Sequence, residues 1–378
     1  MKNLSLKSFI IGFLFLCAIH IHAHAQELQQ GQINFDVNNP KTFNYLIDNQ
    51  IKENYAFSGL AFYLNQVQYY AVSANDIKTL DRDSKQATVL NNGDWFAIVG
   101  RFNVLLIKAD KLSIKFDAQQ AIIHSQTTAQ SFIISKPNLA KLAPELSQIR
   151  YHHLWIPFAW VAKGSEWLLV QVHQLSHLNW GLSILLFALL IKLLLFPVAK
   201  ITTKSQQNVS KITTQLQPKL AEIKQNYDGE EAHHKLMQAY KDLGVSPFYT
   251  LKPMLSFLVQ IPVLIGVFNA LGEMPQLSGQ PFLWFNDLAL PDMFLSLDFQ
   301  LPFMGNYLNL MPILMTLITL MSTIFHTDVH ATVQENKKQK IKLYLMAASF
   351  LILFYPFPAA MVMYWAMANL LQFIQTKL

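Results

Sequence analysis

The hydrophobic positions divide the chain into a mixed N-terminal part and an apolar C-terminal part. Over residues 26–150, β-branched and aromatic residues alternate with polar ones in short runs, a pattern typical of half-buried strands. From residue 178 onward, the apolar runs are long enough for helices that cross a membrane. The pattern predicts a small antiparallel β-sandwich followed by an α-helical membrane domain. The strand-like runs are 58–72, 94–108, 111–116 and 130–135, and a short helix over 139–149 is expected to lead to the membrane.

Five spans are predicted in the C-terminal part. The last apolar stretch, 341–374, is too long for one span, and Pro356 and Pro358 divide it because a proline pair stops a helix. Before the first span, residues 151–177 are aromatic-rich, but Pro157, Lys163, Gly164 and Glu166 break the apolar run, which favours a helix lying in the membrane interface over a span. The predicted spans are about 179–198, 254–271, 307–325, 341–355 and 359–374.

Lysines orient these spans. Residues 199–248 carry seven lysines and residues 326–342 carry four, whereas residues 272–306 carry no lysine or arginine. The positive-inside rule therefore predicts that both lysine-rich loops and the C-terminus are cytoplasmic. The 199–248 loop is predicted to form an αα-hairpin, with Pro218 interrupting its first helix.

The first 25 residues have the pattern of a signal peptide. A short apolar run at 9–19 follows two lysines, and Ala23 and Ala25 form an A-x-A cleavage site. An uncleaved signal anchor is the alternative. The export signal predicts that residues 26–150 lie outside the cytoplasm. The only cysteine, Cys17, belongs to this segment, so a chain cleaved after Ala25 would contain no disulfide and no thiolate metal site.

The composition argues against an ordinary soluble enzyme. Of the residues, 52% are hydrophobic and only 14% are charged, and the mean hydropathy is positive. No phosphate-binding loop, H-E-x-x-H or G-x-S-x-G motif occurs in the sequence. In the exported part, Arg82 and Arg101 are expected to be surface or pairing residues. We therefore predict that the protein is not an enzyme and needs no metal or other cofactor.

One charged residue interrupts the first span. Lys192 lies within the apolar run 185–200, where an ammonium group is costly unless it reaches water or has a function. One interpretation is that its long side chain extends to the cytoplasmic interface. The other is a cationic site in a hydrated cavity open to the cytoplasm. Other polar residues also lie inside the predicted spans. Taken singly, such a residue is typical of a contact between helices. They are Gln260, Asn269, Asn369 and Gln372.

The sequence from about 151 to 378 resembles the YidC/Oxa/Alb family of membrane protein insertases. The resemblance rests on NWGLSILLFALLIKLLLFPVAK at 179–200, PMLSFLVQIPVLIGVFNAL at 253–271 and FPAAMVMYWAMANLLQFIQ at 357–375, with shorter matches at LQPK, WFNDL and MPILM. It implies five core helices around a hydrophilic groove that is open to the cytoplasm and to lipid. It also implies a surface helix before the first core span, a mobile cytoplasmic hairpin and a shortened periplasmic domain.

The resemblance also assigns the groove residues. Lys192 matches the arginine of the family's groove, which keeps the charge but loses the planar fork of a guanidinium. Ala188 stands where the family has a hydroxyl. The other groove positions are Gln260, the aromatic pair Tyr364 and Trp365, and Asn369.

The implied function is insertion and folding of integral membrane proteins in the bacterial inner membrane, without nucleotide hydrolysis. A small-anion transporter or a lipid scramblase using the same cavity is the alternative. The expected partners are nascent integral membrane proteins and membrane lipids, with the Sec translocon and the ribosome as further candidates and no sequence-specific recognition of nucleic acid. The predicted fold is thus a polytopic α-helical protein with a five-helix insertase core and a cytoplasmic αα-hairpin, preceded by a small β-sandwich-like exported domain.

Overall fold

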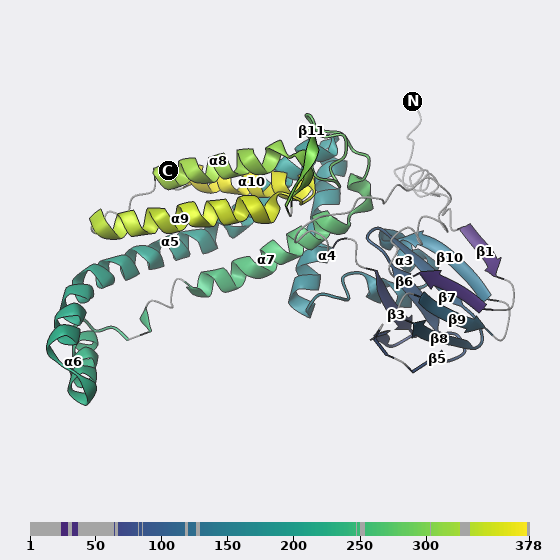
Figure 1. The fold of residues 1–378 in the computed structure, drawn as a ribbon, viewed down its shortest axis with the longest axis horizontal. Coiled ribbons are helices and arrows are strands. Elements are labelled where there is room, and N and C mark those ends of the chain that lie inside the picture. Colours follow the sequence, from purple (N-terminus) through teal and green to yellow (C-terminus); the bar gives the residue numbers. More distant parts are fainter. Residues whose placement is uncertain are drawn as a thin grey trace, which may run out of the picture. The chain divides into compact units, whose positions relative to one another are not determined.

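The chain forms two compact units (Figure 1). The first comprises Met1–Asn54 and Val67–Arg150, and the second comprises Tyr55–Gln66 and Tyr151–Leu378. The computed structural model describes residues 24–28, 32–36, 64, 67–81, 83–84, 86–117, 120–125, 129–246, 248–249, 254–302, 304–325 and 333–375.

Two antiparallel sheets build the first unit. Its strands are β1 (His24–Leu28), β2 (Gln32–Asp36), β3 (Gln68–Val72), β4 (Ile77–Thr79), β5 (Thr88–Leu90), β6 (Trp95–Val99), β7 (Asn103–Lys108), β8 (Leu112–Asp117), β9 (Gln120–Ser125) and β10 (Ala129–Ser135). One sheet has the order β1-β10-β7-β6-β3-β4 and the other has the order β2-β9-β8-β5. All the described pairings in both sheets are antiparallel.

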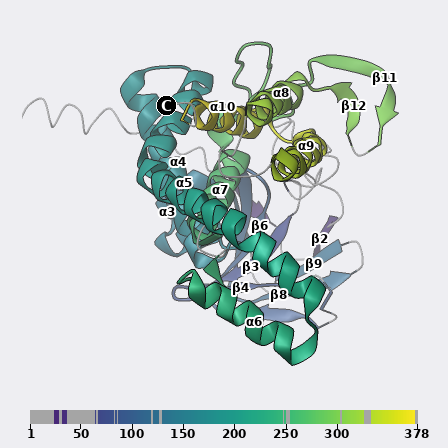
Figure 2. The same cartoon turned by 90° about the vertical axis from the view of Figure 1, so that its left-hand side faces the viewer.

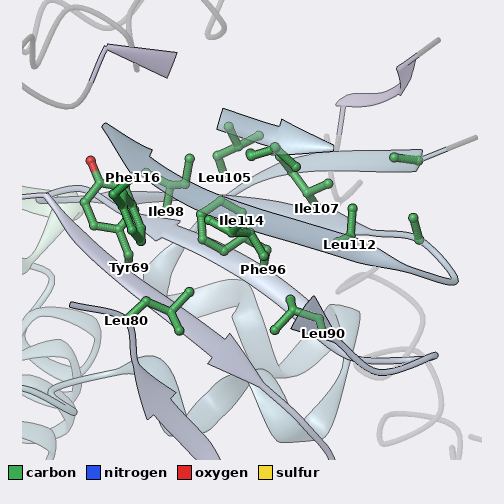
Figure 3. Close-up of a cluster of buried hydrophobic side chains, with 13 residues drawn as sticks. Tyr69, Leu80, Leu90, Phe96, Ile98, Leu105, Ile107, Leu112, Ile114 and Phe116 are labelled. Carbon is green, nitrogen blue, oxygen red and sulfur yellow. The ribbon is translucent and has the colours of Figure 1, made fainter. Parts of the chain in front are cut away.

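The two sheets share one hydrophobic core (Figure 3). The ring of Tyr69 on β3 meets that of Phe116 on β8 edge-on, with 5.0 Å between the centroids. Phe96 and Ile107 from the first sheet and Ile114 from the second have no exposed surface. Because apolar side chains from both sheets fill this space, the predicted antiparallel sandwich is confirmed.

The outer face of the six-stranded sheet is covered as well. Leu139, Leu146 and Ile149 pack on this face and are buried. With both faces covered, β6 and β7 are buried along almost their whole length, which explains why their sequences are continuously apolar. The predicted single helix over 139–149 is wrong, because Ala143 is extended before Pro144, as proline favours. The covering turns are η2 (Lys136–Asn138), α3 (Leu139–Leu142) and η3 (Pro144–Ile149).

The predicted signal cleavage falls within strand β1. Ala25 on β1 pairs with Phe132 on β10, so cleavage after Ala25 would leave Gln26, Glu27 and Leu28 in the paired strand. Ala23 and the apolar run at 9–19 lie outside the described residues, as does Arg82. Cleavage therefore stays a prediction. Arg101 stacks on the ring of Phe102, 4.5 Å from its centroid, as expected of a pairing residue.

The second unit is helical and carries one small hairpin of strands (Figure 1). Helices occur at each of the five predicted span positions and at the predicted interfacial segment. Among the described residues, one helix is long and apolar enough to cross a membrane, Trp180–Asn226, and a shorter apolar stretch covers Leu310–Ser322. The elements are α4 (Ile156–Ser176), α5 (Trp180–Asn226), α6 (Gly229–Asp242), α7 (Met254–Glu273), η5 (Pro275–Leu277), β11 (Leu295–Leu301), β12 (Gly305–Leu308), α8 (Leu310–Ile324), α9 (Val333–Phe354) and α10 (Ala359–Gln375).

Helix α5 is a single helix of 47 residues. Its first turn is capped by Asn179, whose side-chain oxygen accepts a hydrogen bond from the backbone nitrogen of Leu182. At 1.5 Å per residue it is about 70 Å long, roughly twice the hydrocarbon thickness of a bilayer. The predicted interruption at Pro218 is therefore wrong. The distal half packs against α6 around Leu216 and Ala239, which makes the helical hairpin seen in Figure 2.

Pro157 and the pair Pro356 and Pro358 lie at helix ends. Pro157 lies in the first turn of α4, where a missing N–H is tolerated, so a helix forms over the predicted interfacial segment. In contrast, α9 ends at Phe354 and α10 begins at Ala359, as the pair Pro356 and Pro358 predicted. The first N–H groups of α10 donate to the loop before β11, from Ala359 to the carbonyl oxygen of Leu290 and from Ala360 to that of Leu288.

Gly266 allows α7 to pack so closely against α4 that a side chain at this position would not fit between the two helices. A Cβ atom on Gly266 of α7 would lie 2.5 Å from Cγ1 of Val161 and 2.9 Å from the backbone nitrogen of Ala162. Real side chains do not tolerate such distances, so this crossing requires glycine. Gly164, on α4 itself, has open space around it.

We expect Gly266→Ala to force the two helices apart and to destabilise the protein by about 1–3 kcal/mol. The measurement is the midpoint of thermal unfolding in detergent. Gly164→Ala is the matched control, because it adds the same methyl group in open space and should be neutral or stabilising by up to about 1 kcal/mol. Equal stability of the two variants would show that the close crossing is not required.

Candidate functional site

Lys192, the charged residue of the first predicted span, lies on the side of α5 that packs against other helices. The buried residues Ile184 and Ala188 precede Lys192 at intervals of four, so all three share one helix face. Lys192 is half-buried, whereas its neighbours Leu193 and Leu194 are 60% and 67% exposed. The lysine side chain therefore belongs to the face that packs on other helices.

The ammonium group of Lys192 is hydrogen-bonded to α10. Its Nζ donates to Oε1 of Gln372 over 2.9 Å, in a partly buried contact between residues 180 positions apart. Helices α5 and α10 lie alongside one another, with α8 next to α10 (Figure 1). The contact joins two of the polar residues that the sequence placed inside separate predicted spans.

A second amide links α10 to α8. Nδ2 of Asn369 donates to Oγ1 of Thr319 over 3.1 Å, and this hydroxyl donates in turn to the carbonyl oxygen of Met315. Asn369 and Gln372 are three residues apart, so they lie on neighbouring positions of one face of α10. Helix α10 is thus held by one amide to α5 and by another to α8.

The predicted aromatic pair lies in a separate cluster. Tyr364 is 6% exposed, and its ring lies 5.8 Å from that of Phe187 on α5. The ring of Trp365 packs against Phe268 on α7 and Phe354 on α9, at 5.8 and 5.5 Å. The pair therefore fills the space between four helices about two turns from Gln372. Nε1 of Trp365 is buried and has no hydrogen-bond partner among the described residues.

The remaining predicted positions differ in their surroundings. Gln260 on α7 is half-buried, and no hydrogen bond in the described part of the chain joins it to Lys192. Asn269 on α7 contacts the segment just before α4, where its Oδ1 is 3.3 Å from Nε2 of His153. The same ring nitrogen is 3.4 Å from Oε1 of Glu273. The structure thus brings Lys192 together with Gln372, but not with Asn269.

Sequence reasoning missed a polar network at the start of α8. Asp292 is 5% exposed, and its Oδ2 accepts hydrogen bonds from the backbone nitrogen of Met311 and, at 3.5 Å, from Nε1 of Trp284. Nδ2 of Asn309 donates to the carbonyl oxygen of Tyr355 over 2.7 Å. The network therefore ties the loop before α8 to the end of α9. A usable signal was an aspartate among apolar residues shortly before a predicted span.

Metal chemistry has no visible basis in the part of the chain that the structure describes, where no group of three or more His, Cys, Asp or Glu residues could hold an ion.

The profile of the family described as "60Kd inner membrane protein" matches residues 171–378, more than half of the chain. The chain belongs to this family. The match includes α5 to α10 and therefore all the proposed groove residues, and it leaves out the β-sandwich.

Curated relatives of the family carry the name "Membrane protein insertase YidC", which confirms the resemblance found in the sequence. The chain is 34% identical to one from Chlorobaculum parvum over 199 residues, which are 52% of this chain and 32% of the relative. It is 30% identical to one from Polynucleobacter asymbioticus over 344 residues, 84% of this chain and 56% of the relative. One from Chloroherpeton thalassium is 28% identical over 270 residues, 70% of this chain and 44% of the relative. The chain thus matches between about a third and somewhat more than half of the length of these YidC relatives.

The buried carboxyl of Asp292 makes the stability of this YidC-like chain depend on pH. Burial raises the pKa of Asp292 above its ordinary value of 3.8, although the hydrogen bonds from Met311 and Trp284 oppose the shift. Because the pKa is raised in the folded state, the contribution of Asp292 to the free energy of unfolding is fully present below the pKa of the unfolded state. That contribution is lost as the pH rises through the folded pKa.

We therefore expect Asp292→Asn, which cannot ionise, to gain thermal stability relative to the unmodified protein as the pH rises from about 4 to neutrality. The difference in unfolding midpoint should change by a few °C, of the order expected for about 1 kcal/mol. Asp298→Asn on β11 is the control, because this residue is exposed. A difference that stays constant with pH, or falls, would contradict the assignment.

Proposed function

We propose that the chain inserts integral membrane proteins into the bacterial inner membrane and helps them to fold. Membership of the family and the insertase name of its relatives support this proposal. The observation that carries it in this chain is Lys192, a positive charge within an apolar helix face, held by an amide and not by a carboxylate. A charge held in this way can attract an anionic segment of a substrate.

The proposed site is a hydrated groove bounded by α5, α7, α8 and α10. Lys192, Gln260 and Asn369 would offer polar parts of a substrate an alternative to water partway across the membrane. Tyr364 and Trp365, which pack between the helices, would close the groove at its apolar end. The residue roles follow the family resemblance, and the contacts between α5, α8 and α10 give them a physical basis.

Short helices would lower the free-energy barrier that remains for moving a polar substrate segment across the bilayer. Helix α8 has 15 residues and α10 has 17, which correspond to about 22 and 26 Å. Both are shorter than the roughly 30 Å of hydrocarbon in a typical bilayer, so the membrane would become thinner beside them. The apolar helix of the substrate then leaves sideways into lipid. Its burial drives the reaction without nucleotide hydrolysis or a cofactor.

In this proposal the first part of α5 and helices α7 to α10 span the membrane five times, and α4 lies in the interface. The exposed side chains of Trp155, Trp160 and Trp167 support an interfacial position for α4, because tryptophan favours this region. The hairpin of α5 and α6 and the C-terminus are cytoplasmic, and the β-sandwich is periplasmic. Nascent membrane proteins and lipids are the partners, with the Sec translocon and the ribosome as further candidates.

The test is the charge of Lys192. We expect Lys192→Arg to retain insertion, and Lys192→Ala and Lys192→Glu to impair it for a single-span substrate with an acidic translocated tail. Opposite charges about 4 Å apart attract by roughly 4 kcal/mol at an effective dielectric constant near 20, and a glutamate would repel similarly. Insertion into vesicles carrying the full chain is measured by protection of the tail from protease.

Two controls accompany this test. The same substrate with a neutral tail should be affected much less, and Lys200→Ala, which removes an exposed lysine of the same helix, should be nearly silent. If Lys192→Ala inserts both substrates as well as the unmodified protein at equal protein level, the role of the charge is wrong.

A further inference from the structure

The acceptor of the Lys192 hydrogen bond is a neutral amide. An ammonium group has three donors and no acceptor, so only the oxygen of Gln372 can face it. The Nε2 group of Gln372 therefore turns its two donors away from Nζ. The chemistry of the pair fixes this orientation of the amide.

A neutral acceptor restrains the lysine without cancelling its charge. A carboxylate in place of Gln372 would form an ion pair and leave no net charge at this point. Within the described residues, Lys192 has no ion pair with an aspartate or glutamate. The full positive charge therefore remains available, at a position set by the hydrogen bond.

The helix that carries Gln372 is itself fixed. Asn369, one turn before Gln372, binds Thr319 on α8, while the N-terminal N–H groups of α10 donate to Leu288 and Leu290. Because α10 is held at both ends, the amide of Gln372 does not need to be ordered when a substrate arrives. A site with fixed donors binds a charged group more strongly than a flexible one.

We propose that Gln372 is the positioning residue of the groove charge and a second donor to the substrate. Gln372 Oε1 holds Lys192, and its Nε2 donates beside Nζ to the same carboxylate of a translocating segment. A carboxylate has two oxygens and can accept one hydrogen bond from each group. This inference rests on the proposed function and adds a second residue, Gln372, to the site that would receive an acidic segment of the substrate.

The test compares insertion of the acidic-tail and neutral-tail substrates in vesicles that carry the full chain. Insertion is expressed as the ratio of the acidic-tail substrate to the neutral-tail substrate. Gln372→Glu should lower this ratio several-fold, to about the level of Lys192→Ala, because the new carboxylate neutralises the lysine. Gln372→Leu keeps the charge but loses the restraint and the donor, so its ratio should fall less. Gln375→Glu is the matched control, with the same substitution one turn further along α10.

A charge exchange gives a readout that a structural role alone would not produce. Lys192→Gln should lower the ratio, and adding Gln372→Lys to it should restore the ratio, because one ammonium again faces one amide. An unchanged ratio in Gln372→Glu, or failure of the exchange to restore it at equal protein level, would overturn the role of Gln372. Absence of insertion of either substrate by the unmodified chain would overturn the proposed function, and this inference with it.

Discussion

An ammonium group within an apolar helix needs an acceptor, and this requirement governs the arrangement of the second unit. Lys192 finds its acceptor 180 residues later, on α10, so the first and last of the predicted spans must lie side by side. The choice of an amide rather than a carboxylate leaves the charge in place. Other contacts of α10 hold this helix in place.

Three kinds of contact provide that support. Asn369 ties α10 to Thr319 on α8, and the carbonyl oxygens of the loop before β11 accept from the first turn of α10. Between them, the rings of Phe268, Phe354 and Trp365 pack together from α7, α9 and α10. Aromatic packing of this kind supplies large buried area with little loss of side-chain freedom. The amide that binds Lys192 therefore lies on a helix that is packed into an apolar cluster about two turns away.

Local pattern predicted the elements better than it predicted their contacts. Alternation located strands β3, β6, β7, β8 and β10 but not β1, β2, β4, β5 or β9, and the proline pair at 356 and 358 separated α9 from α10. Proline misled at Pro218, which α5 accommodates. The sequence also placed Lys192 and Gln372 inside spans, but their hydrogen bond depends on tertiary packing and no local pattern encodes it.

The same distinction applies to the site as a whole. The resemblance assigned Tyr364 and Trp365 to the groove, and the structure adds that both rings contact other helices, which only packing could reveal. The network of Asp292, Asn309 and Tyr355 was missed because each residue is unremarkable in sequence and acts only when the loop folds onto α8 and α9.

Crosslinking can show whether a substrate segment passes beside Lys192. A photoreactive residue would be placed at Leu195, one turn from Lys192, and separately at Leu194, which is 67% exposed on the opposite side of α5. The substrate would be a single-span protein arrested partway through insertion. If the segment passes beside Lys192, we expect adducts with the arrested chain from position 195 and far fewer from position 194. Equal yields from both positions, or no adduct from position 195, would contradict a path beside Lys192.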